Sequence, residues 1–308
     1  MPNRDTITTS ESARVGLLGA PGELVAPTAA VRARPEVAAR TERSERREQS
    51  RSGRHPLTAR RWFRVTAGAV LPLILLLVWQ LSTALGLVST AQLPSPEMVG
   101  AAGLDLAQRG LLGQYAAIST QRVLVGFAIG SVLGLAFGAL VGLSKASDAF
   151  FAPTLGAIRA VPSLAWIPLL LLWLGIQEDS KITLIAIGAF FPVYTTVASS
   201  LRHVDRQLVE AGRAFGLNGL KLFLVVQLPA VIPSVISGLR LALAQAWLFL
   251  VAAELIASSM GLGFLLIESQ NNGRIDRIFL AIIMLAVLGK LTDALVGVFE
   301  TWANKKWA

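Results

Sequence analysis

Five ionisable side chains lie inside apolar stretches of this sequence, where they could bind and pass a charged solute: Arg159, Arg240, Glu254, Lys290 and Asp293. Ionisable groups are rare in segments that cross a lipid bilayer, and those that occur usually face the interior of a helix bundle or a polar pathway. Nothing in the sequence resembles a nucleophile with its base. The residues therefore favour passage of a solute over covalent catalysis.

Four of these groups have simple structural interpretations. Lys290 and Asp293 are three residues apart on one helical face, so we interpret them as a local pair. Arg240 and Glu254 are about four turns apart and do not meet each other; we expect Arg240 to snorkel to the inner membrane interface. We interpret Glu254 as a carboxylate satisfied by helix packing, with a role in the pathway or its gate as the alternative.

The remaining cation, Arg159, opens the segment RAVPSLAWIPLLLLWLGI. With Ser163 and Trp166 it could line a polar path for an anion. The alternative is that Arg159 anchors the start of this helix at the membrane interface, and that Trp166 belongs to an aromatic belt.

Membrane helices must carry these side chains, because the chain is too apolar for a soluble domain. It has 308 residues, of which 54% are hydrophobic and 15% charged, with a mean hydropathy of +0.60, whereas soluble domains contain about 25% charged residues. We predict an all-α polytopic membrane bundle over residues 61–308, with its core at 119–300. Six spanning helices, each near the ~20 residues that a bilayer core requires, are expected at 65–87, 123–143, 157–176, 182–201, 230–256 and 277–298. The third and fourth form a helical hairpin, or one of them is partly re-entrant.

Charge is concentrated at the N-terminus. Residues 1–64 hold thirteen Arg and seven acidic residues, and we expect residues 1–60 to form a disordered, Arg-rich cytoplasmic tail. The loop 202–229 is also cationic, so the positive-inside pattern puts it and both termini in the cytoplasm. The excess charge is a tail that can meet lipid headgroups, which argues against a nucleic-acid partner. With no Cys and two His, we expect no metal site.

Small residues recur through the second expected span. Glycine occupies every fourth position there, at Gly126, Gly130, Gly134, Gly138 and Gly142. Four residues turn a helix by about 400°, so these glycines form one stripe without side chains that winds slowly around the helix. Such a stripe is suited to close backbone contact in lipid. We favour tight packing inside the subunit; a dimer seam or a moving gate contact is the alternative.

The loop between the fourth and fifth spans has its own pattern. The run EAGRAFGLNGLKLFLVVQLP predicts a short helix opened by Glu210, a turn, and an apolar stretch that ends in a proline. The residues that define it are Glu210, Ala211, Gly212, Phe215, Gly216, Leu228 and Pro229. Ala211 and Gly212 would keep the helix surface flat for a partner groove, Phe215 would be an apolar anchor, and Gly216 would end the helix with φ > 0.

This pattern resembles the EAA loop of binding-protein-dependent ABC importers. The spacing matches at Glu210, Ala211, Gly216, Leu228 and Pro229; Gly212 and Val226 are mild departures from the family's Ala and Ile. In that family the loop is the coupling helix that docks into a separate ATPase subunit. The chain itself has no G-x-x-x-x-G-K-[ST] run, so ATP and Mg²⁺ would be bound by that partner, and no cofactor is expected here.

The resemblance extends over residues 64–300. Segments such as FPVYTT, GLRLALAQAWLFLVAAELIASSMGLGFLL and AIIMLAVLGKLTDALV look like the permeases that import aliphatic sulfonates, with taurine and nitrate permeases as close relatives. The resemblance implies a type I importer permease fold, a permease homodimer, two cytoplasmic ATPase subunits, an extracytoplasmic substrate-binding protein and the bacterial inner membrane.

Other functions remain open at this point. The same type of permease could import nitrate or a thiamine precursor. An ion-coupled secondary transporter would need inverted repeats, which the sequence does not show, and it would leave the loop pattern unexplained. A membrane-embedded enzyme lacks a recognisable site.

Overall fold

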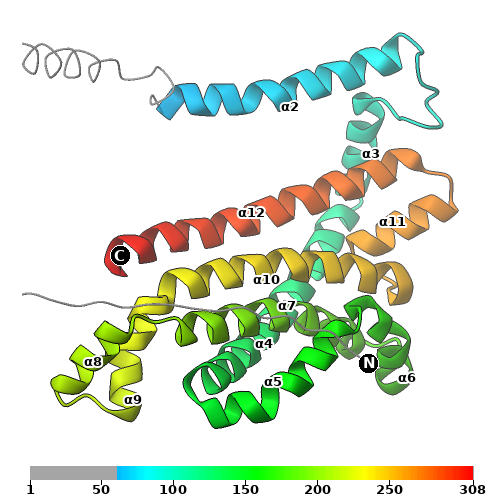
Figure 1. Ribbon diagram of the computed structural model, residues 1–308. Coiled ribbons are helices and arrows are strands. Elements are labelled where there is room, and N and C mark those ends of the chain that lie inside the picture. Colours follow the sequence, from blue (N-terminus) through cyan, green and yellow to red (C-terminus); the bar gives the residue numbers. More distant parts are fainter. Residues whose placement is uncertain (1–60, 308) are drawn as a thin grey trace, which may run out of the picture. The chain divides into compact units, whose positions relative to one another are not determined.

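A computed structural model describes residues 61–307, and that part of the chain is helical with no strand (Figure 1). The contacts below all lie within the compact unit formed by residues 70–308. In chain order, the elements are α2 (Arg61–Ala84), α3 (Pro96–Gln108), α4 (Leu111–Leu143), α5 (Lys145–Ala160), the 3₁₀ turn η2 (Ser163–Trp166), α6 (Ile167–Leu174), α7 (Glu178–Arg202), α8 (Arg206–Ala214), α9 (Gly219–Leu222), the π-helical turn η3 (Phe223–Gln227), α10 (Leu228–Ala257), α11 (Leu262–Asn271) and α12 (Ile275–Trp307). The tail predicted for residues 1–60 lies outside the described residues.

Helix α7 is central to the bundle, with α4 against one side and α10 against the other, and α12 packs on α10. Figure 1 shows α7, α10 and α12 running side by side, with the α8–α9 loop at one end and α11 at the other. Val123, Ile185 and Leu250, one from each of α4, α7 and α10, are fully buried in the main apolar core. The all-α class expected from the composition is confirmed.

The glycine stripe of α4 lies against α7. A Cβ atom added at Gly126, Gly130, Gly134, Gly138 or Gly142 would come within 3.0 Å of an atom of α7 in each case. The same closeness recurs on the other side of α7, where a Cβ atom at Gly188 would lie 2.4 Å from the Phe249 ring of α10. The missing side chains therefore allow α4 to approach the backbone of α7, and allow the Phe249 ring of α10 to pack directly on α7.

Four helical stretches are long and apolar enough to cross a membrane among the described residues: Leu111–Leu143, Glu178–Arg202, Gly219–Ala257 and Ile275–Trp302. The apolar part of α2, Val70–Ala84, is shorter. A count of six spans therefore requires α2 as the first span, and α5 together with η2 and α6 as the third.

The third expected span, 157–176, is not a continuous helix. Lys145–Ala160 and Ser163–Leu174 meet at an angle of 87°. Pro162 causes the break: it disfavours helical geometry at the residue before it, and Val161 is extended, with φ −70° and ψ 125°. The chain therefore makes a sharp bend within the expected span, which is compatible with the alternative that the third or fourth span is partly re-entrant.

Two other boundaries differ from expectation. Helix α4 begins at Leu111, twelve residues before the expected start at 123, because the polar residues between them remain helical. Helices α3 and α11 were not predicted; α3 is opened by Ser95, whose hydroxyl accepts a hydrogen bond from the Met98 amide at 3.2 Å.

Candidate functional site

The loop between α7 and α10 is built around the short helix α8. Asp205 caps its start, because the Asp205 carboxylate accepts a hydrogen bond from the Gln207 amide at 2.8 Å. The helix ends at Ala214, and Gly216 follows with φ +79°, a left-handed conformation that favours glycine. The sequence pattern therefore identified both the helix and the residue that ends it.

Two residues of the pattern lie in other positions than expected. Glu210 is in the middle of α8, because the helix starts four residues earlier, at Arg206. Its carboxylate pairs with the Arg206 guanidinium one turn before it, at 2.8 Å, so it is a surface ion pair and not a charge on the helix N-terminus.

Gly212 is buried and faces the rest of the loop. A Cβ atom there would lie 2.7 Å from Leu222 of α9 and 3.1 Å from Val226 of η3. The expectation that Gly212 flattens the surface for a partner was wrong: its lack of a side chain lets α8 fold back onto α9 and η3.

The outer surface of the loop is apolar and carries charges around it. The Phe215 side chain is 86% exposed and the Leu220 side chain 71% exposed. Ala211, Arg213 and Lys221 are also exposed on this loop. Exposed large apolar side chains clustered at one tip are typical of a surface that a partner covers.

The loop is connected to α7 by a short link and to α10 by continuous helix. Three residues, 203–205, link α7 to α8. On the other side α9, η3 and α10 follow one another without a gap, and Pro229 lies in the first turn of α10, next to Leu228. A π-helical turn such as η3 often marks a functional site.

A second polar cluster lies at the opposite end of α10 and is centred on Arg122 of α4. Its guanidinium donates to both carboxylate oxygens of Glu178, at 2.6 and 2.7 Å, to Glu254 at 2.6 Å, and to the Met260 carbonyl at 2.6 Å. Arg122 is 5% exposed and Glu254 is fully buried. This arrangement ties α4 to α7, to α10 and to the turn before α11.

The rest of the cluster completes the shell around Glu254. Its carboxylate accepts hydrogen bonds from the Ser119 hydroxyl, at 2.8 and 2.9 Å, and from the Gly263 amide at 2.8 Å. Lys181 pairs with Glu178 at 2.9 Å, so two cations balance two carboxylates. Buried charges are tolerated when they are paired and hydrogen-bonded in this way. The Glu254 carboxylate is therefore fully hydrogen-bonded within the helix packing, and a role in the pathway or its gate stays a prediction.

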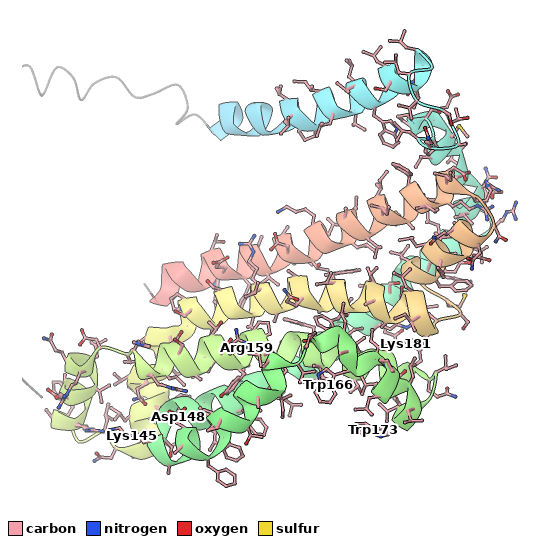
Figure 2. All side chains as sticks on the ribbon, turned by 45° about the vertical axis from the view of Figure 1, so that its right-hand side comes forward. Lys145, Asp148, Arg159, Trp166, Trp173 and Lys181 are labelled. Atoms are coloured by element: carbon pink, nitrogen blue, oxygen red, sulfur yellow. The ribbon has the colours of Figure 1, made fainter. Side chains whose placement is uncertain are left out.

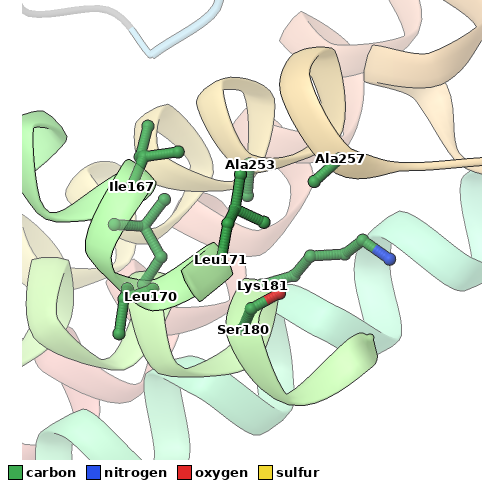
Figure 3. Close-up of a pocket in the computed structure, with 8 residues that line it drawn as sticks. Ile167, Leu170, Leu171, Ser180, Lys181, Ala253 and Ala257 are labelled. Carbon is green, nitrogen blue, oxygen red and sulfur yellow. The ribbon is translucent and has the colours of Figure 1, made fainter. Parts of the chain in front are cut away.

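The apolar side of this cluster is closely packed. Lys181, Ile167 and Ala257 border a void of only about 10 Å³ between α6, α7 and α10. Figure 3 shows the Lys181 amine pointing away from the apolar side chains of α6. The lysine thus reaches Glu178 while its methylenes cover the core.

A further group of charged side chains links α10 to α12. Asp293 accepts hydrogen bonds from Lys290, at 3.1 Å, and from Arg240 through both of its oxygens. Glu300 also pairs with Arg240, at 3.0 Å. The local Lys290–Asp293 pair is present as expected, but Arg240 pairs between helices where snorkelling was expected.

The candidate pathway residues lie along the bent pair α5–α6. Figure 2 shows Arg159, Trp166 and Trp173 in succession there. Trp166 lines an apolar cavity of about 360 Å³ between α4, α5 and α7, whereas Arg159 and Ser163 are not among its lining residues. Arg159 is exposed and Ser163 partly buried.

Sequence reasoning missed Ser119, Arg122, Glu178 and Lys181. Arg122 lies one residue before the expected start of its span and was therefore not counted among the ionisable residues of the spans. The signal was available in Glu254: a carboxylate deep in an apolar helix requires a cation nearby, and Arg122 continues the four-residue spacing of the glycine stripe, one step before Gly126.

The comparisons with known proteins agree with this architecture. A family model described as "Binding-protein-dependent transport system inner membrane component" matches residues 130–305. The chain is 42% identical over 241 residues to the putative aliphatic sulfonates transport permease protein SsuC of Escherichia coli (strain K12), which covers 78% of this chain and 92% of that protein. It is 40% identical over 241 residues to the protein of the same name from Bacillus subtilis (strain 168), covering 77% of this chain and 87% of that protein.

A solved structure has a similar arrangement of helices. The inward-facing MetNI methionine ABC transporter matches with a TM-score of 0.56 and 19% sequence identity, over 64% of this chain and 98% of that chain. At this identity the likeness concerns the fold alone, and it confirms the expected permease fold.

Proposed function

Because this chain belongs to the family of inner membrane components of binding-protein-dependent transport systems, we propose that it forms the translocation pathway for aliphatic sulfonates in an ATP-driven importer. The proposed substrate rests on one observation, the similarity to two permeases named for aliphatic sulfonates, which extends over more than three quarters of the chain. Taurine, itself a sulfonate, falls in the same class.

The α8–α9 loop is the proposed docking element for a cytoplasmic ATPase. Its support is the combination of an 86% exposed Phe215, close packing of α9 and η3 against Gly212, and direct continuity with α10. ATP and Mg²⁺ belong to the ATPase in this proposal. Leu228 and Pro229 set the point at which the loop enters α10.

The proposed assembly contains two copies of this chain, two ATPase subunits and an extracytoplasmic binding protein. Both termini and the α8–α9 loop face the cytoplasm, which the cations of the loop favour. Closure of the ATPases on ATP draws the two loops together and opens the pathway to the binding protein; hydrolysis returns it to the inward-facing state. Arg159, Ser163 and Trp166 remain the proposed pathway residues, with Glu254 as a further candidate near the outer end of α10.

Growth on single sulfur sources tests the substrate. A strain that lacks this gene should fail to grow on ethanesulfonate or taurine and should grow normally on sulfate. The strain must lack other sulfonate importers, so that unchanged growth on both sulfonates refutes the proposal. Loss of growth on nitrate as the only nitrogen source would instead support the nitrate alternative.

Retention of the ATPase tests the docking loop. Phe215→Asp places a charge in the proposed apolar contact and should reduce co-purification of the ATPase at least tenfold, the effect of losing about 1.4 kcal/mol of binding free energy. Ile176→Asp is the matched control, because Ile176 is 71% exposed in the turn between α6 and α7. Equal retention by both variants would refute docking at Phe215.

A further inference from the structure

The apolar cavity between α4, α5 and α7 has the size of a small-molecule site. Its volume is about 360 Å³, and no charged residue is among its lining residues. Pockets for small ligands are commonly about 300–1,000 Å³ and mostly apolar, with a few polar groups that fix orientation. Thr183 and the Trp166 indole are the polar groups of its wall. The cavity is therefore suited to a hydrocarbon portion of a ligand.

A cation directly follows one of the lining residues in the chain. Leu155 and Ile158 of α5 line it, and Arg159 is four residues after Leu155, so it lies on the same face of the helix. Arg159 is exposed and makes no hydrogen bond or ion pair with a described residue. The acid of the same helix, Asp148, is held by Arg202 at 2.8 Å. No carboxylate of the described residues therefore pairs with Arg159.

We propose that this cavity receives the alkyl chain of an aliphatic sulfonate while Arg159 pairs with its sulfonate group. The inference rests on the proposed function and deepens it, because it assigns the two halves of the substrate to different parts of this chain. An anion without a hydrocarbon portion gains no binding free energy from the apolar walls. A sulfonate with a longer chain gains more than one with a shorter chain.

The expected size of the effect follows from burial of methylene groups. Each buried methylene contributes a factor of about four in affinity, which corresponds to about 0.8 kcal/mol. Affinity should rise by this factor with each added carbon until the cavity is full. Arg159→Gln should weaken short and long sulfonates by the same factor, because it removes only the shared ion pair.

Fluorescence quenching tests contact with the cavity directly. The complete transporter in nanodiscs is titrated with 6-bromohexanesulfonate and with 2-bromoethanesulfonate, whose bromine quenches tryptophan at contact. We expect quenching by the longer compound at concentrations at least tenfold lower. Trp166→Phe should abolish this component, whereas Trp173→Phe, which removes a 65% exposed tryptophan of α6, should retain it. Quenching that survives Trp166→Phe overturns the proposal.

A second pair of variants avoids dependence on Trp166. Ile129 lines the cavity and is 44% exposed, whereas Val132 is 64% exposed and lines no part of it. Ile129→Phe should lower the uptake of hexanesulfonate relative to ethanesulfonate in proteoliposomes, and Val132→Phe should leave the ratio unchanged. An unchanged ratio in both variants, with ethanesulfonate uptake intact, refutes the cavity assignment and leaves the proposed function standing. Absence of all sulfonate uptake refutes the proposed function itself.

Lipid is the competing occupant. Brominated phospholipids in the nanodisc should quench Trp166 weakly, and bromohexanesulfonate should quench it further. Strong quenching by the lipid that hexanesulfonate does not relieve would show that an acyl chain fills the cavity, which overturns the proposal.

Discussion

Replacing Gly130 by Ala tests the closest of the approaches between α4 and α7. The added Cβ atom would lie 2.3 Å from the Ala186 carbonyl oxygen and 2.9 Å from the Cβ atom of Ala189. Ordinary contact begins at 3.4 Å, so the two helices must separate by about 1.1 Å here (3.4 − 2.3). The obstacle is backbone, which cannot rotate aside as the end of a flexible side chain can.

Two opposing terms set the size of this effect. Alanine is favoured over glycine inside a helix by about 1 kcal/mol. Overpacking costs about 1–3 kcal/mol, and the separation also weakens neighbouring contacts along the seam. We therefore expect Gly130→Ala to lower the free energy of unfolding by roughly 1–2 kcal/mol.

A glycine elsewhere in the same helix supplies the control. A Cβ atom at Gly113 would have no atom within 4 Å, so Gly113→Ala should leave stability unchanged or raise it. Both variants are measured by denaturant unfolding in mixed micelles, with thermal unfolding as a second readout. If Gly130→Ala were as stable as Gly113→Ala, the two helices would not be packed at backbone distance and the reasoning would fail.

Three further substitutions test a buried ion pair, an exposed ion pair and the turn that ends α8. Glu254→Gln removes one of the two carboxylates that face the buried Arg122, which keeps Glu178, and should cost about 1–3 kcal/mol in the same unfolding assay; the double variant Arg122→Met, Glu254→Met should recover part of the loss, and a single variant as stable as the parent would contradict this. Asp293→Asn weakens a pair whose Arg240 is 41% exposed, so the loss should be at most about 1 kcal/mol, and a loss equal to that of Glu254→Gln would count against the burial argument. Gly216→Val forces a branched residue to φ +79° and should reduce sulfonate uptake while the protein still appears in the membrane fraction; normal uptake would argue against a role for this turn in coupling.

Patterns that depend on one helix were readable from the sequence. The four-residue glycine spacing predicted a close helix contact, because it fixes one face of α4 whatever that face touches. The loop pattern located α8, since a glycine with positive φ and a proline at the start of a long helix are local requirements. The apolar composition was enough for the all-α membrane class.

Features that depend on several helices could not be read in the same way. Gly212 was assigned to the outer surface because the sequence does not show that α9 and η3 fold back over it. The network around Arg122 joins residues that are up to 138 positions apart in the chain, and no local spacing indicates such a contact. The bend at Pro162 was predicted only as one alternative, a partly re-entrant span, because a proline in an apolar run is compatible with both a kinked span and a broken one.

The close approaches on both sides of α7 determine how the bundle responds to force. Gly130 brings α4 against the backbone of α7, and Gly188 brings the Phe249 ring of α10 equally close. Tightly packed interiors have low compressibility and transmit strain, so these three helices form a stiff body with little slack. We therefore expect a displacement applied at the α8–α9 end to be passed along these helices towards the Glu254 end, with the α5–α6 bend and the short link before α8 as the places where the chain can yield.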